Sequence, residues 1–503
     1  MIDHICLIIP PSLFLLDERV FMSLGILKIA AVLEKAGVEV EVLDLSGIPN
    51  YVEITRRHVV SSGTSCYGIT ATTPQMPAVT KIQRTIRSLL PGARLILGGP
   101  HATLIHAACR YERKHGLRSR AHKAWEKLET MFDVIVAGDG ETAVFQALRP
   151  DPPALVDGDD PASDLFLKNT QLETLPFPAR HLIDVASYHY EIDGIPALSM
   201  IAQLGCPFGC GFCGGRKSPM LRRTRMRSSD SIVQEMIHLH QTFGINGFML
   251  YDDELNVNPA MVQLMDTIAE TQRRMGVEFR LRGFIKAELF TDEQAAAMYR
   301  AGFRWLLVGF ESGHERILAN IQKQATLAEN TRCLEIAKRH GLKVKALMSV
   351  GHPGESAETV HATRDWLLSV QPDDFDVTLI TTYPGTPYFD EAVETSPGVW
   401  TYTYQKTGDR LHSLEVDYTQ VAEYYKGVPG HYQSYVYTDY LSREDLVQWR
   451  DELEHGVRAR LQIPHHRGAP AIRYEHSMGG QGHLPASILR QTSPHRIPHR
   501  KIA

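Results

Sequence analysis

Three cysteines within eight residues are the side chains whose spacing most clearly predicts chemistry. Cys206, Cys210 and Cys213 stand in the run L-G-C-P-F-G-C-G-F-C-G-G. Thiolates this close together, with glycines that let the backbone wrap around a ligand, usually bind zinc or an iron–sulfur cluster. Such sites normally close with four protein ligands, and no fourth cysteine lies nearby. Three ligands leave one metal position open, as a catalytic centre requires.

The spacing Cys-x3-Cys-x2-Cys, with Phe212 directly before the last cysteine, resembles that of the radical SAM superfamily. The resemblance implies that the three thiolates are the metal ligands of a [4Fe-4S] cluster. It also implies that S-adenosylmethionine (SAM) binds the fourth iron through its amino and carboxylate groups. The alternative is a zinc knuckle that takes a histidine as its fourth ligand. His238 and His240 are nearest on the C-terminal side, and both fall in a predicted helix well past the loop.

Six strand–helix steps, counted from Leu198, predict the element that carries this loop. The first strand runs straight into the cysteines, and the later strand patterns alternate with helical ones. Six parallel strands form a partial (β/α)6 TIM-type barrel, whose active site lies at the carboxyl ends of the strands. The predicted strands are Leu198–Leu204, Gly247–Tyr251, Glu278–Leu281, Trp305–Phe310, Lys343–Val350 and Phe375–Ile380.

Charged and small residues follow these strands, as a ligand site requires. Asp252 and Asp253 follow the second strand, and Arg280 is assigned to the end of the third. These three are the candidate catalytic residues, through contact with a substrate, and solvation is the simpler alternative for the carboxylates. Falling together at successive strand ends, such residues are better interpreted as a site than as isolated loop residues. By resemblance to the family, the residues expected to bind SAM are Phe212, Glu311, Ser312, Gly313, Ser349, Gly351, Tyr383 and Pro384.

A run of basic residues follows the cysteines closely. This run could contact an anionic substrate or a cofactor phosphate. A solvated loop explains the basic residues equally well. The residues are Arg216, Lys217, Arg222, Arg223, Arg225 and Arg227.

Residues 1–150 alternate short apolar runs with helical patterns. Their near-continuous Val, Ile and Leu content is typical of parallel strands covered on both faces. A doubly wound, Rossmann-like sheet is therefore predicted, with its ligand beyond the carboxyl ends of the strands. No G-x-G-x-x-G follows the first strand, so a dinucleotide is not expected. The predicted strands are Ile5–Ile9, Val38–Leu43, Cys66–Thr70, Arg94–Leu97 and Asp133–Val136.

The strand-end motifs S-L-G-I-L, G-G-P-H and G-D-G-E, which precede the cysteine loop, resemble the cobalamin-binding domain of B12-dependent radical SAM enzymes. The D-x-H-x-x-G motif that supplies a histidine ligand to cobalt in many cobalamin proteins is absent. Cobalamin without that lower ligand is expected, and a Rossmann-like domain that only supports the barrel is the alternative. By the resemblance, the cobalamin contacts are Ser23, Leu24, Gly25, Thr70, Thr72, Gly98, Gly99, His101, Gly138 and Glu141.

Length and composition agree with a multidomain cytoplasmic protein. A chain of 503 residues suits two or three domains, and its formal charge of −5 gives no reason to expect nucleic acid or an anionic membrane as partner. No apolar run approaches transmembrane length, and seven mostly scattered cysteines do not resemble a disulfide framework. The expected division is 1–150 cobalamin domain, 151–195 linker, 196–388 barrel, 389–461 tyrosine-rich region that shapes substrate choice, and 462–503 disordered tail.

These motifs together predict an α/β enzyme that cleaves SAM to a 5′-deoxyadenosyl radical and uses methylcobalamin to methylate an unactivated carbon of a small molecule or natural product. A reductant protein of the flavodoxin or ferredoxin type is the expected partner. One alternative keeps both cofactors but ends in cyclisation, rearrangement or oxidation. Another, from a different class, is a cobalamin-binding sensor with a structural cluster. A methylthiotransferase is disfavoured because Cys6, Cys66 and Cys109 lack the context of additional cluster ligands.

Overall fold

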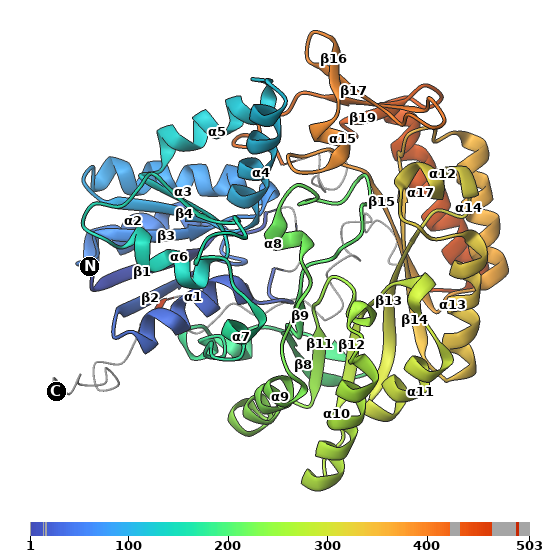
Figure 1. Ribbon diagram of the computed structural model, residues 1–503, viewed down its shortest axis with the longest axis horizontal. Helices are drawn as coiled ribbons and strands as arrows, with labels where there is room; N and C mark the ends of the chain where they lie inside the picture. The colour runs from blue at the N-terminus through green and yellow to red at the C-terminus, as the bar shows by residue number, and fades with distance from the viewer. Residues whose placement is uncertain (1, 14, 16–17, 423–432, 465–488, 492–503) are drawn as a thin grey trace.

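Two mainly parallel β-sheets organise the computed structural model, which describes residues 2–13, 15, 18–422, 433–464 and 489–491 (Figure 1). The first sheet forms an N-terminal domain, and the second forms a half-barrel beside it. A small antiparallel sheet follows near the C-terminus. The predicted fold class, a Rossmann-like domain followed by a partial barrel and a small C-terminal region, is confirmed.

The N-terminal sheet has the strand order β20-β2-β1-β3-β4-β5-β6, in which β20 runs antiparallel to β2 and the other neighbours are parallel. Five strands fall where the sequence predicts them. The predicted linker contributes a further strand, β6. Sequence patterns do not reveal it, because the four residues L-V-D-G are too few to show a strand periodicity. The predicted disordered tail contributes β20, while 465–488 and 492–503 lie outside the described residues. The strands are β1 (His4–Ile9), β2 (Glu39–Asp44), β3 (Cys66–Thr70), β4 (Arg94–Gly98), β5 (Val134–Gly138), β6 (Leu155–Gly158) and β20 (Leu489–Gln491).

Helices cover both faces of this sheet (Figure 1). Helices α1 and α6 pack on one face, whereas α2, α3, α4 and α5 pack on the other. The polar, basic stretch between Ala107 and Lys127 is divided between α4 and α5. Glu112 of α4 fixes where α5 begins. Its carboxylate accepts hydrogen bonds of 3.0 Å from the N–H groups of Ser119, Ala121 and His122 at the start of α5. The helices are α1 (Leu24–Lys35), α2 (Tyr51–Ser61), α3 (Met76–Leu89), α4 (Pro100–Lys114), α5 (Arg120–Met131) and α6 (Gly140–Ala147).

The half-barrel has the strand order β15-β14-β13-β12-β11-β8-β7, and its six long strands are parallel as predicted. The third strand, β12, begins at Arg280 and continues to Ile285, four residues beyond the predicted end. The strands are β7 (Glu191–Ile192), β8 (Ile195–Met200), β11 (Gly247–Leu250), β12 (Arg280–Ile285), β13 (Phe303–Glu311), β14 (Lys343–Val350) and β15 (Asp374–Leu379).

The helices of the half-barrel line its outside (Figure 1). Three of them end at a glycine in the left-handed conformation, namely Gly244, Gly276 and Gly302, which fixes where the chain returns to the next strand. The main helices are α9 (Ser229–Phe243), α10 (Met261–Met275), α11 (Asp292–Ala301), α13 (Leu327–Arg339) and α14 (Ala357–Val370), and the shorter ones are α8 (Pro219–Arg222), α12 (Glu315–Ile321) and α15 (Pro387–Asp390).

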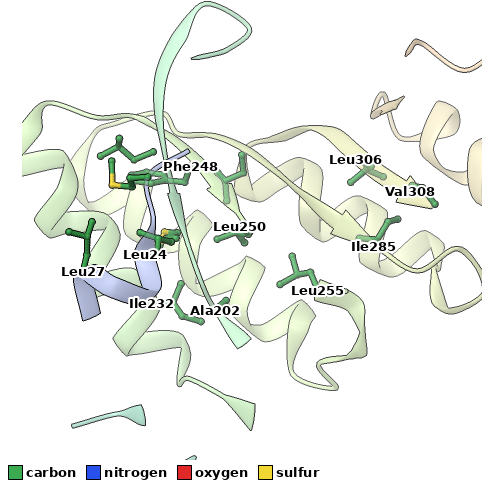
Figure 2. Close-up of a cluster of buried hydrophobic side chains, with 14 of the residues drawn as sticks. Leu24, Leu27, Ala202, Ile232, Phe248, Leu250, Leu255, Ile285, Leu306 and Val308 are labelled. Atoms are coloured by element: carbon green, nitrogen blue, oxygen red, sulfur yellow. The ribbon is translucent and has the colours of Figure 1, made fainter. Parts of the chain in front are cut away.

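One hydrophobic core runs from the N-terminal domain into the barrel (Figure 2). Leu24 and Leu27 of α1 belong to the same buried cluster as Ile232 of α9 and Leu250 of β11. The segment between the domains is packed as well. Arg180, 2% exposed, donates to Glu235 Oε1 at 2.8 Å and to the carbonyl oxygen of Ser199 at 2.9 Å. The two domains are therefore fixed against each other.

The C-terminal region forms the antiparallel sheet β16 (Val393–Ser396), β17 (Val399–Thr403), β18 (Arg410–Leu414) and β19 (Val436–Thr438), followed by α17 (Arg443–Leu461). It also contacts the N-terminal domain. The guanidinium of Arg120 in α5 lies 3.6 Å from the Phe389 ring centroid and 4.5 Å from that of Trp400, and it donates to the carbonyl oxygen of Phe389 at 2.7 Å. Tyr424, Tyr425 and Tyr432, part of the predicted tyrosine-rich region, lie outside the described residues. Among the helices that are described, none combines the length and apolar character needed to span a membrane.

Candidate active site

The three clustered cysteines lie on one loop beyond the carboxyl end of β8, between β9 (Gln203–Leu204) and α8. Arg216 organises this loop from within. Its Nη1 donates to the carbonyl oxygens of Cys206, at 3.2 Å, and Phe208, and its Nη2 donates to that of Gly214 at 3.4 Å. Gly211 lets the loop pack against α15, because a Cβ there would lie 2.3 Å from the Tyr388 ring. The loop is thus held by its own arginine and by the C-terminal region.

The thiols on this loop fit the ligands of an iron–sulfur cluster. All three are partly buried and free of disulfides, and burial raises the pKa of each, that of Cys213 to about 12. A bound metal is therefore what would hold them as thiolates. Within the described chain, none of the three belongs to a group of three donor atoms within 4.8 Å of one another, as one zinc ion would need. His240 Nδ1 is occupied instead by Asn246 Oδ1 at 2.7 Å.

A hydrogen-bonded chain of side chains lies at the strand ends beside the loop. Lys323 Nζ donates to Glu311 Oε1 at 2.8 Å, and Ser349 Oγ donates to Glu311 Oε2 at 2.7 Å. Ser349 Oγ also lies 2.8 Å from His352 Nε2, whose Nδ1 lies 3.2 Å from the Tyr388 hydroxyl. Burial lowers the pKa of His352 to about 3, so its imidazole is neutral. This series of hydrogen-bonded side chains links the ends of β13 and β14 to α15.

Two buried lysines, Lys286 and Lys323, supply positive charge that sequence analysis missed. Burial opposes the charge of Lys323, but Glu311, Cys210 and Glu254 together raise its pKa above the usual range. Lys286 Nζ donates to the carbonyl oxygen of Lys323 at 2.8 Å, and lies 4.1 Å from the Phe208 ring centroid. Lys286 directly follows β12, so a correct end for that strand would have revealed it. Both ammonium groups act on Cys210, whose thiol pKa they lower against burial.

The other residues expected to bind SAM lie around these hydrogen-bonded side chains and differ in how far they are buried. Phe212 packs edge-on against His352, with ring centroids 5.5 Å apart. Ser312 is turned towards α14, where its Oγ lies 3.2 Å from Thr363 Oγ1, and a Cβ at Gly313 would lie 2.7 Å from the Thr363 Cα. Pro384 is buried, and Gly351 takes a left-handed φ of 99° after β14.

The structure corrects the assignment of Arg280. This residue is the first of β12, so it lies at the amino end of the barrel, opposite the cysteine loop. Asp252 is placed at the correct end but has a structural contact, because its Oδ1 accepts hydrogen bonds from the N–H groups of Ala202 and Gln203 at 2.8 and 2.7 Å. Asp253, by contrast, is exposed. Of the three candidates, Asp253 alone combines the correct end of the barrel with a free surface.

The basic residues after the loop are mostly paired within the protein. Arg225 Nη1 donates to Asp139 Oδ2, a contact that joins the loop segment to the N-terminal domain. Arg227 donates to Glu235 Oε2 at 2.6 Å, and Lys217 to Glu391 Oε1 at 3.0 Å. Arg225 therefore joins this segment to the N-terminal domain, Arg227 joins it to α9, and Lys217 joins it to the C-terminal region.

A cavity of about 420 Å³ lies at the carboxyl ends of the N-terminal strands, and Tyr251 and Tyr383 line it from the barrel side. We call it the interdomain cleft. Ser23 and Thr72, both predicted cobalamin contacts, line it. Gln75 shapes its wall: its Oε1 accepts from the Thr72 N–H at 2.9 Å, and its Nε2 donates to Ser12 Oγ at 2.9 Å. The remaining lining residues include Ile9, Ser46, Thr73, Pro74, Pro100 and Leu104.

Several predicted cobalamin contacts do not line the cleft. His101 is 1% exposed, its Nδ1 lies 3.1 Å from Thr73 Oγ1, and it lines a different cavity near Arg120. Leu24 is buried in the core, and a Cβ at Gly138 would lie 2.2 Å from the backbone of β6. The predicted contacts placed outside the cleft lining are Leu24, Gly25, Thr70, Gly98, Gly99, His101, Gly138 and Glu141.

The cysteine loop adjoins the interdomain cleft. A Cβ at Gly214 would lie 3.3 Å from the Leu104 side chain and 3.4 Å from the Tyr383 ring, and both of these residues line the cleft. A ligand in the cleft would therefore lie next to the loop.

Comparison with known families matches both parts. The radical SAM superfamily matches residues 200–367, and the B12 binding domain matches residues 18–117. The chain is a B12-dependent radical SAM enzyme. Its cofactors are accordingly a [4Fe-4S] cluster, SAM and cobalamin.

Two relatives of this B12-dependent radical SAM enzyme are each 25% identical to it. The uncharacterized methyltransferase PH0819 of Pyrococcus horikoshii is 25% identical over 341 residues, covering 65% of this chain and 69% of that protein. An anaerobic magnesium-protoporphyrin IX monomethyl ester cyclase of Cereibacter sphaeroides is 25% identical over 343 residues, covering 64% of this chain and 53% of the cyclase. The chain thus matches about half the length of the cyclase.

A solved structure shares the fold across both domains. The radical SAM methyltransferase TsrM from Kitasatospora setae, with cobalamin and a [4Fe-4S] cluster bound, aligns with a TM-score of 0.62. The alignment covers 92% of this chain and 91% of TsrM at 18% identity.

Proposed function

We propose that this enzyme methylates an unactivated carbon of a small molecule within the interdomain cleft. The contact of the cysteine loop with Leu104 and Tyr383 of the cleft is the observation that carries the proposal. When bound, the cluster supplies the electron that cleaves SAM to a 5′-deoxyadenosyl radical, and cobalamin supplies the methyl group. Holding both cofactors and the substrate next to one another replaces encounters in solution with an oriented arrangement.

In this proposal the side chains at the strand ends bind and orient SAM. Cys206, Cys210 and Cys213 hold the cluster. Lys323, paired with Glu311, and the neutral His352 hold the polar edge of the site in a fixed arrangement, because each already has a partner at 2.7–2.8 Å. Preformed polar partners of this kind avoid reorganisation when a charged ligand binds.

The cleft supplies an apolar wall for the substrate. Tyr251 is 40% exposed and lies 5.1 Å from Phe21 and 5.9 Å from Phe284, measured between ring centroids. Aromatic faces favour a flat or apolar portion of a ligand and exclude water from it. Asp253 is the candidate for polar contact with the substrate.

A second candidate function is ring formation without methyl transfer. It is favoured by the likeness to a protein named as a magnesium-protoporphyrin IX monomethyl ester cyclase, whereas the likeness to proteins named as methyltransferases favours methylation. Both functions use the same cleft and cluster loop, so only the product distinguishes them.

The test follows the methyl group. The reconstituted holoenzyme is reduced and given SAM with a deuterated methyl group, together with a metabolite extract from the source organism. Methylation predicts a product that carries the label, with one 5′-deoxyadenosine and one S-adenosylhomocysteine per product. Altered substrate with 5′-deoxyadenosine, but without label or S-adenosylhomocysteine, would instead identify ring formation or rearrangement.

We also propose a cytoplasmic location and a flavodoxin or ferredoxin as the electron donor. Both follow from the need to keep the cluster reduced. The measurement is 5′-deoxyadenosine formation with a purified flavodoxin and its reductase in place of a chemical reductant. Failure of every such donor would contradict the partner assignment.

A further inference from the structure

A second set of metal-binding side chains lies in the N-terminal domain, on the strands whose carboxyl ends lead to the interdomain cleft. Cys6 of β1 and Glu41 of β2 are direct partners in the parallel register, so their side chains share one face of the sheet. His58 of α2 covers that face. One donor atom from each of the three lies within 4.8 Å of the other two, and the residues are 0%, 7% and 6% exposed.

The imidazole of His58 points into this set without a hydrogen-bond partner. Its Nε2 is buried and makes no hydrogen bond, and the nearest carboxylate oxygen, Glu41 Oε2, lies 3.4 Å away. A buried nitrogen without a partner costs free energy unless something else satisfies it. A metal ion between Cys6, Glu41 and His58 would do so.

A further imidazole, that of His4, stands on the solvent side of the three, outside the group of donor atoms that lie within 4.8 Å of one another. His4 precedes Cys6 by two residues, and therefore lies on the same face of β1. Its Nε2 lies 3.5 Å from Glu41 Oε1, and its side chain is 25% exposed, which leaves a path for an ion to enter. Thr64 orients Glu41 and His4, because its Oγ1 lies 3.3 Å from Glu41 Oε2 and 3.0 Å from His4 Nε2. Such hydrogen-bonding partners are typical of the residues around metal ligands.

We propose that Cys6, Glu41 and His58 bind one zinc ion. A thiolate, an imidazole and a carboxylate suit a borderline-soft divalent ion, and the burial of all three suits a structural site. Binding replaces the S–H bond of Cys6 with an S–Zn bond, and the proton leaves to solvent. The ion joins β1, β2 and α2 and takes no part in the reaction at the cluster loop, so this site is independent of the proposed function.

The first test measures zinc in the protein itself. The protein is purified from zinc-supplemented cells and then reconstituted with iron, sulfide and cobalamin. The metals in the resulting holoenzyme are counted by mass spectrometry. The expected result is about one zinc per chain, with an X-ray absorption spectrum that fits one sulfur at about 2.3 Å and nitrogen or oxygen at about 2.0 Å. Absence of zinc in the wild-type holoenzyme would overturn the proposal, and so would a spectrum with three sulfur ligands, which would place the ion on the cluster loop.

Variants locate the ion. Cys6→Ala and His58→Gln should each lower the zinc content at least about tenfold, since each removes a ligand. Cys66→Ala is the matched control: this cysteine is equally buried on the adjacent strand β3, but it belongs to no such donor group. The triple variant Cys206→Ala, Cys210→Ala, Cys213→Ala should keep its zinc. Zinc that survives in Cys6→Ala and His58→Gln but disappears in the triple variant would contradict the site, and the wild-type spectrum decides the question if either single variant fails to fold.

Discussion

The two ligand-binding regions of the molecule are built from different chemistry. The strand ends of the half-barrel present charged side chains that already pair with one another, such as Lys323 with Glu311 at 2.8 Å. The interdomain cleft is lined instead mainly by small hydroxyl groups, apolar side chains and backbone, with Gln75 bonded to its neighbours and a single carboxyl, that of Glu18. Charged partners suit a small zwitterion and a metal cluster, whereas a mostly uncharged surface suits a large ligand that is held by shape.

This contrast implies that single substitutions act differently in the two regions. At the barrel end, a few side chains carry most of the binding, so removing one has a large effect. In the cleft, contact is spread over many small groups, so each substitution has a small effect.

Replacing Cys206, Cys210 and Cys213 with alanine should abolish SAM cleavage while cobalamin still binds. We expect cobalamin in the interdomain cleft, where the predicted contacts Ser23 and Thr72 lie, and none of the three cysteines lines that cleft. Iron and sulfide analysis, 5′-deoxyadenosine formation and the cobalamin absorbance spectrum measure the three properties separately. A triple variant that retains iron and sulfide and still cleaves SAM would show that the cluster lies elsewhere.

Asp252→Asn should change how stability depends on pH. Burial raises the pKa of Asp252 to about 7, against the lowering effect of the Gln203 and Ala202 N–H groups. Because the pKa is higher in the folded than in the unfolded chain, the contribution of this carboxyl is present below about pH 4 and is lost as pH rises towards 7. Asparagine keeps the acceptor oxygen without ionising.

The variant should therefore lose less stability than the wild type between pH 4 and 7, by on the order of 1–4 kcal/mol. Urea unfolding of the metal-free protein at a series of pH values measures this difference. Parallel pH dependences for the two proteins would show that Asp252 does not titrate in this range.

Gly211→Ala should destabilise the cysteine loop. A Cβ at this position would lie 2.3 Å from the Tyr388 ring, and overpacking of this kind costs about 1–3 kcal/mol. Gly209→Ala, two residues away, is the matched control, since no atom lies within 4 Å of its added Cβ. Iron retained after gel filtration should fall in Gly211→Ala alone; equal retention in the two variants would mean that α15 does not support the loop.

Gln75→Ala should weaken cobalamin binding by about three- to tenfold, because it removes the hydrogen bonds that hold Thr72 and Ser12 in the cleft wall, each worth about 1 kcal/mol. Equilibrium titration with hydroxocobalamin measures the change. Cleavage of SAM without cobalamin should stay at the wild-type level. A loss of binding beyond about a hundredfold would show that the cleft, like the barrel end, depends on single side chains.

The sequence predicts the barrel and the cluster loop well because both depend on local patterns. Thiolate spacing, strand periodicity and strand order along the chain are visible in one dimension. The prediction for Arg280 fails because the end of its strand was placed too early. Arg282 is a polar residue inside the buried strand β12, and it hides the true strand end at Ile285. The same error hides Lys286, whose role depends on contacts with Lys323 and the Phe208 ring.

The cleft was harder to predict because its residues come from many loops. Ser23 and Thr72 line it as expected, but His101 in the G-G-P-H motif turns towards Thr73 and another cavity. Motif residues identify the domain, whereas the orientation of each side chain depends on packing between distant segments. Arg225 illustrates this, because its partner Asp139 lies 86 residues earlier in the chain.

The contact of Arg120 with Phe389 and Trp400 sets an order of events during synthesis. At about 5–20 residues per second, the ribosome delivers Phe389 roughly 15–50 s after Arg120. Strands β1 to β6 are complete before Tyr251 and Tyr383 are delivered, whereas β20 of the same sheet comes last. A newly made chain therefore exposes the N-terminal side of the cleft lining before the two tyrosines of the barrel side are made.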